Sequence, residues 1–595
     1  MSYRLMTALF GTILCAGTLS GANANFALEP QKKLIKFGWD APPPAYLLKH
    51  LDEIENHMTP YDGMSIDLNS STKKKAPPGS KWERAAGSAS MMFGDWKWER
   101  SFFEREIAEL KEANAKLKYL KHNFINTNSM AVIKDKFDWF DDEIWSVITN
   151  NFALMASIAK ETGCKGLLLD IENYERQTFL YNPAMKHSYA DTWDKVRQRG
   201  REFITAITKA YPDITLFTFF WLDQNYVSAD GVNSPYLKSE KWIMGLSLAF
   251  INGIYDVLPE TATIVEGMEA AGNRANRRSD YETIAANRMK KSKWLIDPAH
   301  YEKYRRRTQL GIATYLDRYI HTDPKSVWFL SADAKKNLEL LKRNLGYALY
   351  FSDEYAWTWG EKRSWYPWKF TGWMKKACDA VKRPGPLWED ALPGITRGMI
   401  YAKDPHRYYR EKIANNEFPQ NLVRNPGFED TSAAEVNGKL PSDCNFLKAA
   451  RPWGYWQPAS SKGHFIIEKG TGFNGSKAAK LTGVKSGTVL QGIQLEENGV
   501  YFLRAKAKTA GNANVTLNIG WHDEKGRWNF WGSNVAVPFS GKTVNGWKEA
   551  SFLLMKEQIP AGAKSFSVML GVKGGESGQD QVLIDDVEVY NLNGK

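Results

Sequence analysis

Residues 166–172, Gly-Leu-Leu-Leu-Asp-Ile-Glu, have the pattern of a buried strand that ends in two carboxylates. Three consecutive leucines predict a strand covered on both faces, as in a parallel sheet. Asp170 and Glu172 are two residues apart, so in a strand they point to the same side. Because an unpaired carboxylate is costly to bury, the pair favours the polar mouth of an active site. The alternative is a pair of structural acids bonded to backbone amides or to an arginine.

Segments with strand and helix patterns alternate from about residue 30 to residue 380. The predicted strands are residues 34–39, 63–68, 119–125, 166–172, 214–221, 263–269, 310–315 and 346–351. Strands separated by helices in this way are typical of a (β/α)₈ TIM-like barrel, whose catalytic groups project from the C-terminal ends of the strands. An open doubly wound sheet is the alternative. If it bound a nucleotide it would carry a glycine-rich phosphate loop, and the sequence has none.

The first 24 residues have the pattern of a secretory signal peptide. Arg4 precedes an apolar run over residues 5–19, and Ala22-Asn23-Ala24 forms an Ala-x-Ala cleavage site. We therefore expect a secreted or periplasmic protein, cleaved after Ala24. No later segment has the uninterrupted apolar length of a transmembrane helix. The formal net charge is +12, but no nucleic-acid motif accompanies it, so no nucleic-acid partner is expected. No pattern bears on oligomeric state, and a monomer is the default expectation.

The sequence pattern changes after the predicted barrel. Residues 381–420 form a polar, basic connector that opens with Pro-Gly turns, and residues 421–593 lose helical periodicity. Short alternating strands and Gly/Asn turns there predict an all-β sandwich. The sequence thus predicts a multidomain protein.

This last domain resembles the CenC-type carbohydrate-binding modules. The resemblance rests on an opening Asn-Leu-Val-Arg-Asn-Pro-Gly-Phe-Glu-Asp at 421–430 and an ending Val-Leu-Ile-Asp-Asp-Val-Glu-Val at 582–589. It implies a jelly-roll fold and a structural calcium ion, for which Glu429 and Asp586 are the matching carboxylates. The alternative is that these two acids only cap turns. Two or three of six aromatic residues are the expected sugar platforms of the module, and the others are expected in its core: Trp453, Tyr455, Trp456, Trp521, Trp528 and Trp531.

The Asp170-Ile171-Glu172 element resembles the end of the strand-four signature in chitinase-like glycoside hydrolases. The resemblance implies that Glu172 is the general acid and that Asp170 orients an N-acetyl group of the substrate. The upstream aspartates of the family signature are replaced by leucines, which argues against substrate-assisted chemistry.

Glycoside hydrolysis needs two carboxyl groups, one as acid and one as nucleophile or base. We predict Glu172 as general acid/base supported by Asp170, with Glu269 as first choice for the opposing carboxylate and Glu354 as second. Glu266 is predicted to be structural. Residues at the ends of other predicted strands are expected to bind substrate: Trp39, Asp40, Trp221 and Trp357. No catalytic cofactor is expected, since the chain has no HExxH, CxxC, P-loop or GxSxG motif.

These predictions describe an exported glycoside hydrolase that acts on a polysaccharide or oligosaccharide and carries a sugar-binding module. Two alternatives remain. One is a polysaccharide-binding protein without catalysis, and the other is a polysaccharide lyase acting on an acidic glycan, which would need a Tyr, Lys or His base near an arginine.

Overall fold

The computed structural model describes residues 32–71, 92–129, 137–172, 177–184, 186–228, 240–430, 453–473, 476–541 and 543–594. The predicted signal peptide and its cleavage site at Ala24 lie outside these ranges. The chain divides into two compact units, one over Ala27–Pro405 and the other over His406–Lys595. The predicted connector contributes to both, because the division falls inside residues 381–420. No helix in the described ranges is long and apolar enough to span a membrane.

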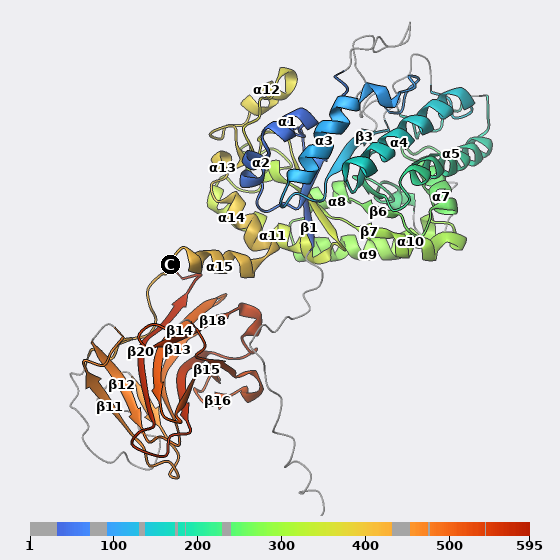
Figure 1. Ribbon diagram of the computed structural model, residues 1–595. Helices are drawn as coiled ribbons and strands as arrows, with labels where there is room; N and C mark the ends of the chain where they lie inside the picture. The colour runs from blue at the N-terminus through green and yellow to red at the C-terminus, as the bar shows by residue number, and fades with distance from the viewer. Residues whose placement is uncertain are drawn as a thin grey trace, which may run out of the picture. The chain divides into compact units, whose positions relative to one another are not determined.

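The first unit is built on one parallel sheet wrapped by helices (Figure 1). Its strands follow the order β7-β6-β5-β4-β3-β2-β1-β9-β8. Their bounds are β1 Lys33–Gly38, β2 Gly63–Ile66, β3 Phe124–Asn128, β4 Gly166–Asp170, β5 Thr215–Thr218, β6 Thr263–Glu266, β7 Thr308–Leu310, β8 Ala313–Tyr315 and β9 Tyr355–Gly360. Because neighbouring strands are parallel, their C-terminal ends meet at one edge of the sheet.

The sheet is curled, and its two edge strands, β7 and β8, follow one another directly in the chain. Only Gly311 and Ile312 separate β7 from β8, and the Gly311 N–H donates to Glu266 O on the β6 side at 2.9 Å. On the other side, the Trp357 N–H of β9 donates to Ile312 O at 3.3 Å. Position 311 requires glycine, since a Cβ there would lie 2.6 Å from Val265 Cγ1.

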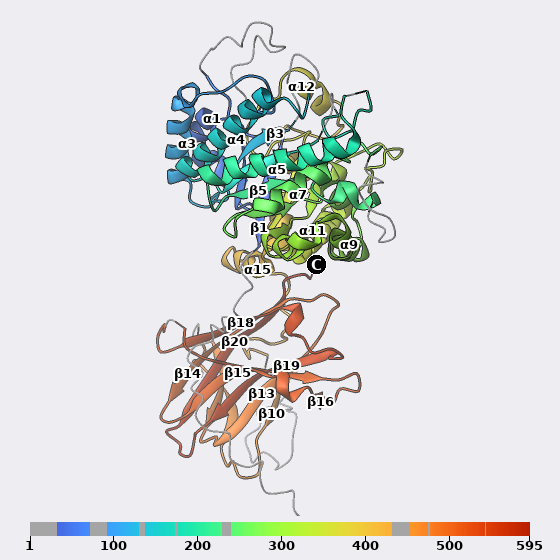
Figure 2. The ribbon, with the colours of Figure 1, turned by 90° about the vertical axis from the view of Figure 1, so that its right-hand side faces the viewer.

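Helices lie around this sheet (Figure 2). They are α1 Pro44–Lys49, α2 Leu51–His57, α3 Glu104–Lys116, α4 Asp142–Thr162, α5 Tyr189–Ala210, α7 Ser247–Val257, α8 Glu269–Arg274, α9 Arg278–Leu295, α10 Tyr301–Arg307, α11 Ala334–Phe351, α12 Gly372–Asp379, α13 Trp388–Ala391 and α14 Ile395–Lys403. Helix α4 shows how the sequence sets their ends: the Asp141 side chain accepts the Ile144 N–H, and Gly163 ends the helix in the left-handed region at φ 77°.

The predicted eighth strand is wrong. Residues 346–351 form the last part of α11, where Leu341, Leu345 and Ala348 are fully buried at helical spacing. The strand is β9 instead. Glu354 therefore precedes its strand, and its carbonyl accepts the N–H of Lys33 at the start of β1. This places Glu354 at the N-terminal edge of the sheet, opposite Asp170.

The second unit begins at the second residue of α15 Pro405–Ala414 and contains two antiparallel sheets. The first has the order β10-β13-β19-β15-β16, with β17 also paired to β15, and the second has the order β11-β12-β20-β14-β18. Their bounds are β10 Gly454–Trp456, β11 His464–Lys469, β12 Lys477–Thr482, β13 Ser486–Gln494, β14 Tyr501–Ala510, β15 Asn514–His522, β16 Trp528–Asn529, β17 Val535–Pro538, β18 Lys548–Leu554, β19 Ser565–Lys573 and β20 Gln581–Asn591. Alternating side chains of both sheets form one apolar core. The antiparallel sheets agree with the predicted all-β domain, whereas the jelly-roll connectivity stays a prediction.

Candidate active site

Asp170 and Glu172 lie together at the C-terminal edge of the sheet. Asp170 is the last residue of β4, and its Oδ2 accepts a hydrogen bond from Asn128 Nδ2 at the end of β3 (2.9 Å). Its Oδ1 accepts the backbone N–H of Glu172 (2.8 Å). Burial raises the pKa of Asp170 to about 7, and the negative charge of Glu172 adds to the increase. Asp170 thus orients the start of the loop that carries Glu172.

Glu269 faces this pair from the end of β6. It is the first residue of α8, and the preceding Met268 turns the chain in the left-handed region at φ 49°. Burial raises the pKa of Glu269 to about 9, and the charges of Glu172 and Asp170 are the next largest causes. Its Oε1 accepts a long hydrogen bond from Asn273 Nδ2 (3.4 Å), while its Oε2 has no hydrogen-bond partner among the described residues. Glu269 therefore holds its proton at neutral pH.

The charges of two further acids also raise the pKa of Glu269: Asp223 after β5 and Glu361 after β9. We call these five residues the carboxylate ring: Asp170, Glu172, Asp223, Glu269 and Glu361. Asp170, Glu172 and Glu269 were predicted site residues, whereas Asp223 and Glu361 were not; Glu361 follows the strand that the sequence pattern misplaced. The alternation of Trp357 and Trp359 in residues 355–360 is a strand pattern that could have located the true strand.

Glu361 is held by groups from two strands. Its carboxylate accepts hydrogen bonds from Tyr315 Oη (3.1 Å) and Trp359 Nε1 (3.0 Å), and it forms an ion pair with Lys362. Asp317, which follows β8, accepts the backbone N–H groups of Glu361 (2.8 Å) and Lys362 (3.0 Å). The two backbone hydrogen bonds to Asp317 thus fix the turn after β9. Tyr315, Trp359 and Lys362 fix the Glu361 side chain.

Several predicted substrate contacts are instead structural. Asp40 is buried and pairs with Lys36 Nζ at 2.5 Å, while its other oxygen accepts from Ser364 Oγ. Trp357 is fully buried, and its Nε1 donates to Gly267 O and Gly311 O. Trp221 is also buried, with Nε1 bonded to Tyr255 Oη. These indoles fill the interior because their N–H groups find acceptors there.

Glu266 and Glu354 do not belong to the ring. Glu266 is completely buried and accepts from Leu222 N and Tyr304 Oη, each at 3.1 Å, which agrees with its predicted structural role. Glu354 lies at the opposite edge of the sheet and accepts from Gln309 Nε2 (3.1 Å). This corrects its prediction as an alternative partner of Glu172.

Trp39 remains a candidate for substrate contact. It is half-buried after β1, with the exposed Trp373 ring of α12 at 4.7 Å and Lys362 Nζ 4.7 Å above its face. The Lys362 ammonium also pairs with Glu361, so it links this aromatic surface to the carboxylate ring.

In the second unit, burial separates the predicted tryptophans. Trp453 and Trp521 are core residues, with Nε1 bonded to Asn425 O (2.9 Å) and Ser533 O (2.8 Å), which corrects their assignment as sugar platforms. Trp456 is 38% exposed on β10. Trp528 and Trp531 are exposed as well.

The two predicted calcium ligands have protein partners. Asp586 pairs with Lys506 Nζ at 2.8 Å, and Glu429 Oε1 accepts the Lys477 N–H at 3.0 Å. Within the described ranges, no three His, Cys, Asp or Glu side chains form a group that could hold a metal ion. Asp586 does not fit a calcium ligand while it pairs with Lys506, so no calcium enters the proposal below.

No family model matches the chain, and no curated protein matches its sequence. Solved structures that resemble part of it include a family 61 carbohydrate-binding module in complex with β-1,4-galactotriose. That match has 18% identity, covers 29% of this chain and 99% of that chain, and has a TM-score of 0.19. A family 22 xylan-binding domain from Paenibacillus barcinonensis matches at 11% identity over 30% of this chain and 97% of that chain, with a TM-score of 0.20.

The matches also include a Clostridium thermocellum endo-1,4-β-D-xylanase 10B, whose solved structure holds a family 22 module and a family 10 glycoside hydrolase module with xylohexaose. It is 13% identical over 29% of this chain and 28% of that chain, with a TM-score of 0.19. Carbohydrate-binding modules and glycoside hydrolases are thus among the structural neighbours, at low identity and low TM-score.

The raised pKa of Glu269 predicts a pH-dependent cost to stability. In the unfolded chain the carboxyl ionises near its ordinary value of 4.5, whereas the folded protein retains the proton up to about pH 9. Rising pH between these values therefore favours unfolding. We expect Glu269→Gln to match the wild type below pH 4.5 and to be more stable by on the order of 1–3 kcal/mol at pH 8.

Thermal unfolding of both proteins from pH 4 to pH 9 measures this difference. Glu354→Gln, at the opposite edge of the sheet, is the matched control and should show no growing advantage as the pH rises. A constant difference between Glu269→Gln and the wild type across the range would contradict the buried, protonated Glu269.

Proposed function

We propose that the protein is a glycoside hydrolase with a (β/α)₈-type catalytic barrel and a carbohydrate-binding module, acting on an extracellular polysaccharide or oligosaccharide. The observation that carries the proposal is the electrostatic coupling of Glu269 to Glu172 and Asp170 at the C-terminal edge of the sheet. Enzymes of this barrel type hold their catalytic groups at that edge. The predicted signal peptide supports export.

The environments of the carboxyls divide the roles. Glu269 is protonated at neutral pH and can donate its proton to the glycosidic oxygen as the bond breaks. Glu172 is the candidate nucleophile or base on the other side of the sugar, oriented through the hydrogen bond between its backbone N–H and Asp170. This exchanges the roles expected from the sequence, in which Glu172 was the acid. The half-buried Trp39 and exposed Trp373 offer a surface for the apolar face of a sugar ring.

The charges at the mouth disfavour a lyase that acts on an acidic glycan. Such a substrate would meet the negative charges of Glu172 and Glu361, whereas Lys362 is already paired with Glu361. A binding protein without catalysis is the second candidate function, because the same groups could hold a sugar. A buried, protonated carboxyl beside another carboxylate favours chemistry, since binding alone does not need its proton.

A degradation screen of the full mature chain tests the proposal. Xylan, galactan, mannan, cellulose, chitin and pectin would be incubated with the protein, and released sugars would be identified by mass spectrometry. Saturated oligosaccharides support hydrolysis, and unsaturated ones would replace it with a lyase. Binding without release would leave the non-catalytic alternative standing.

The outer face of the sheet β10-β13-β19-β15-β16 is the proposed glycan surface of the module. Tyr455 and Trp521 point into the core, so by strand alternation their neighbours Trp456 and His522 point outward. Trp528 pairs with His522, and its ring covers Gly520, where a Cβ would lie 2.4 Å from the indole. Exposed indoles therefore lie on both edge strands of one face.

We expect Trp528→Ala to weaken glycan binding about tenfold, because the indole supplies a flat apolar surface for a sugar ring; tenfold corresponds to about 1.4 kcal/mol. Affinity electrophoresis of the full chain in gels containing the glycans of the screen measures the change. Trp294→Ala, an exposed tryptophan of the first unit, is the matched control. Unchanged retardation of Trp528→Ala in every gel that retards the wild type would move the glycan surface elsewhere.

A further inference from the structure

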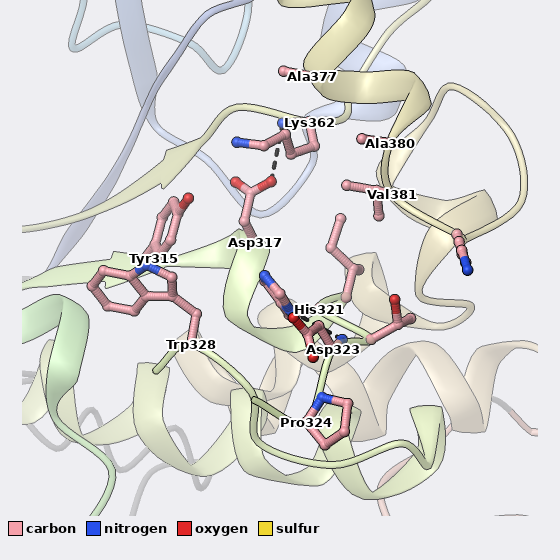
Figure 3. Close-up of a pocket in the computed structure, with 13 residues that line it drawn as sticks. Tyr315, Asp317, His321, Asp323, Pro324, Trp328, Lys362, Ala377, Ala380 and Val381 are labelled. Carbon is pink, nitrogen blue, oxygen red and sulfur yellow. Dashed lines mark hydrogen bonds between the residues drawn. The ribbon is translucent and has the colours of Figure 1, made fainter. Parts of the chain in front are cut away.

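A pocket of about 770 Å³ opens beside the carboxylate ring. Segments that follow β8 and β9 line it, together with the end of α12 and the residues after that helix (Figure 3). Three of its residues, Tyr315, Asp317 and Lys362, belong to the hydrogen-bond network that holds Glu361. The pocket therefore shares a wall with the proposed catalytic mouth.

We propose that this pocket is a second sugar subsite, which holds a neutral sugar unit of the same glycan chain that is cleaved at Glu172 and Glu269. The inference rests on the proposed function and adds to it a place for the substrate to extend. Its volume falls within the range of about 300–1,000 Å³ found for small-molecule sites.

The pocket offers one aromatic surface and one aliphatic wall. Trp328 is half-buried, and its ring meets Tyr315 edge to face at 5.1 Å. Figure 3 shows these two rings on one side of the pocket and the small side chains Ala377, Ala380 and Val381 on the other. An aromatic ring on one side matches the apolar C–H face of a pyranose, and the small side chains leave room for its breadth.

The polar groups of the pocket suit hydroxyls. His321 Nδ1 accepts the backbone N–H of Asp323 (3.3 Å), so the other ring nitrogen, Nε2, is the one that can donate to a ligand. Asp323 Oδ1 accepts the Lys325 N–H (2.9 Å), and no described residue bonds to its Oδ2. These two side chains lie together in the lower part of the pocket in Figure 3, where a sugar hydroxyl could donate to one and accept from the other.

The formal charges of the lining cancel. Asp317 and Asp323 are balanced by Lys362 and Lys382. The carboxylate of Asp317 is also occupied, since it accepts two backbone N–H groups of the turn after β9. A uronic acid or an amino sugar would gain no net attraction here, whereas an uncharged sugar needs none.

The experiment compares substrates of different length. Xylo-, β-1,4-galacto-, cello- and chito-oligosaccharides of two to six units would be incubated with the wild type, Trp328→Ala, Trp328→Phe and the surface control Trp294→Ala. We expect Trp328→Ala to lower kcat/KM about tenfold for the longest cleaved oligosaccharide and to leave the shortest unchanged. Trp328→Phe should recover most of the loss, because it restores an aromatic face.

The outcomes separate this subsite from the proposed function. If the wild type cleaves the oligosaccharides and Trp328→Ala lowers kcat/KM equally at every length, or at none, the subsite falls and the hydrolase stands. Calorimetric binding of the same ladder covers a protein that binds without cleavage: a length-dependent loss of affinity in Trp328→Ala supports the subsite, and an equal affinity overturns it. If no oligosaccharide is cleaved or bound by the wild type, both proposals fall.

Discussion

Replacing Glu172 or Glu269 with glutamine is expected to lower kcat by about 10²–10⁴-fold on any glycan that the wild type hydrolyses. Glutamine preserves the shape of each side chain but can neither donate the proton that Glu269 holds nor attack or deprotonate as a carboxylate does. Removing the charge of Glu172 also removes one cause of the raised pKa of Glu269. The alkaline limb of the activity profile should therefore move to lower pH in any residual activity of Glu172→Gln.

Initial rates on the best substrate of the degradation screen, taken from pH 4 to pH 10, measure both effects. Glu354→Gln is the control, since Glu354 lies at the N-terminal edge of the sheet. Two results would count against the assignment: full activity in either ring variant, or a loss in Glu354→Gln as large as theirs. Exogenous azide offers a further test in alanine variants, which leave room for it: rescue of Glu172→Ala but not of Glu269→Ala would identify Glu172 as the nucleophile.

Replacing Lys36 with methionine is expected to destabilise the first unit by about 3–5 kcal/mol. Lys36 and Asp40 are both buried, with side chains only 2% and 1% exposed, and their charged atoms lie 2.5 Å apart. Burial lowers the pKa of Lys36, while Asp40 opposes that change. Methionine has a similar length but leaves the Asp40 carboxylate without its counter-charge in the interior.

Urea unfolding followed by tryptophan fluorescence measures the loss. The exposed pair Lys116 and Glu112 provides the control, because its side chains are 58% and 52% exposed, and Lys116→Met should cost less than about 1 kcal/mol. The double variant Lys36→Met/Asp40→Leu should recover much of the stability, since it removes both buried charges. A cost for Lys36→Met as small as that of Lys116→Met would show that the pair does not stabilise the fold.

The parts of the site that were predictable depend on local pattern. The triple leucine and the two acids place Asp170 at the end of a parallel strand, and a second apolar strand, two places along the sheet, carries Glu269 beyond its end. Parallel strands bring their C-terminal ends together, so the partnership of the two segments follows from topology. Glu361 was missed because residues 346–351 are as apolar as a strand yet lie in a helix with a buried face.

Tryptophans show the other limit of local pattern. An indole is apolar enough for a core and polar enough at its N–H for a surface, so sequence spacing does not separate Trp456 from Trp521. In the folded chain, Trp521 is completely buried and bonded to a carbonyl, while Trp456 is exposed. Burial is a property of what the rest of the chain packs against each ring.

The sequence by itself determined that the chain has a parallel α/β part followed by an antiparallel β part, and that two acids end a buried strand, because strand periodicity and turn residues act over a few positions. Tertiary structure alone decided which carboxyls meet, which of them keeps a proton and which tryptophans reach the surface. Desolvation and charge proximity set those properties, and both arise between segments about 90 residues apart or more, such as those carrying Asp170, Glu269 and Glu361.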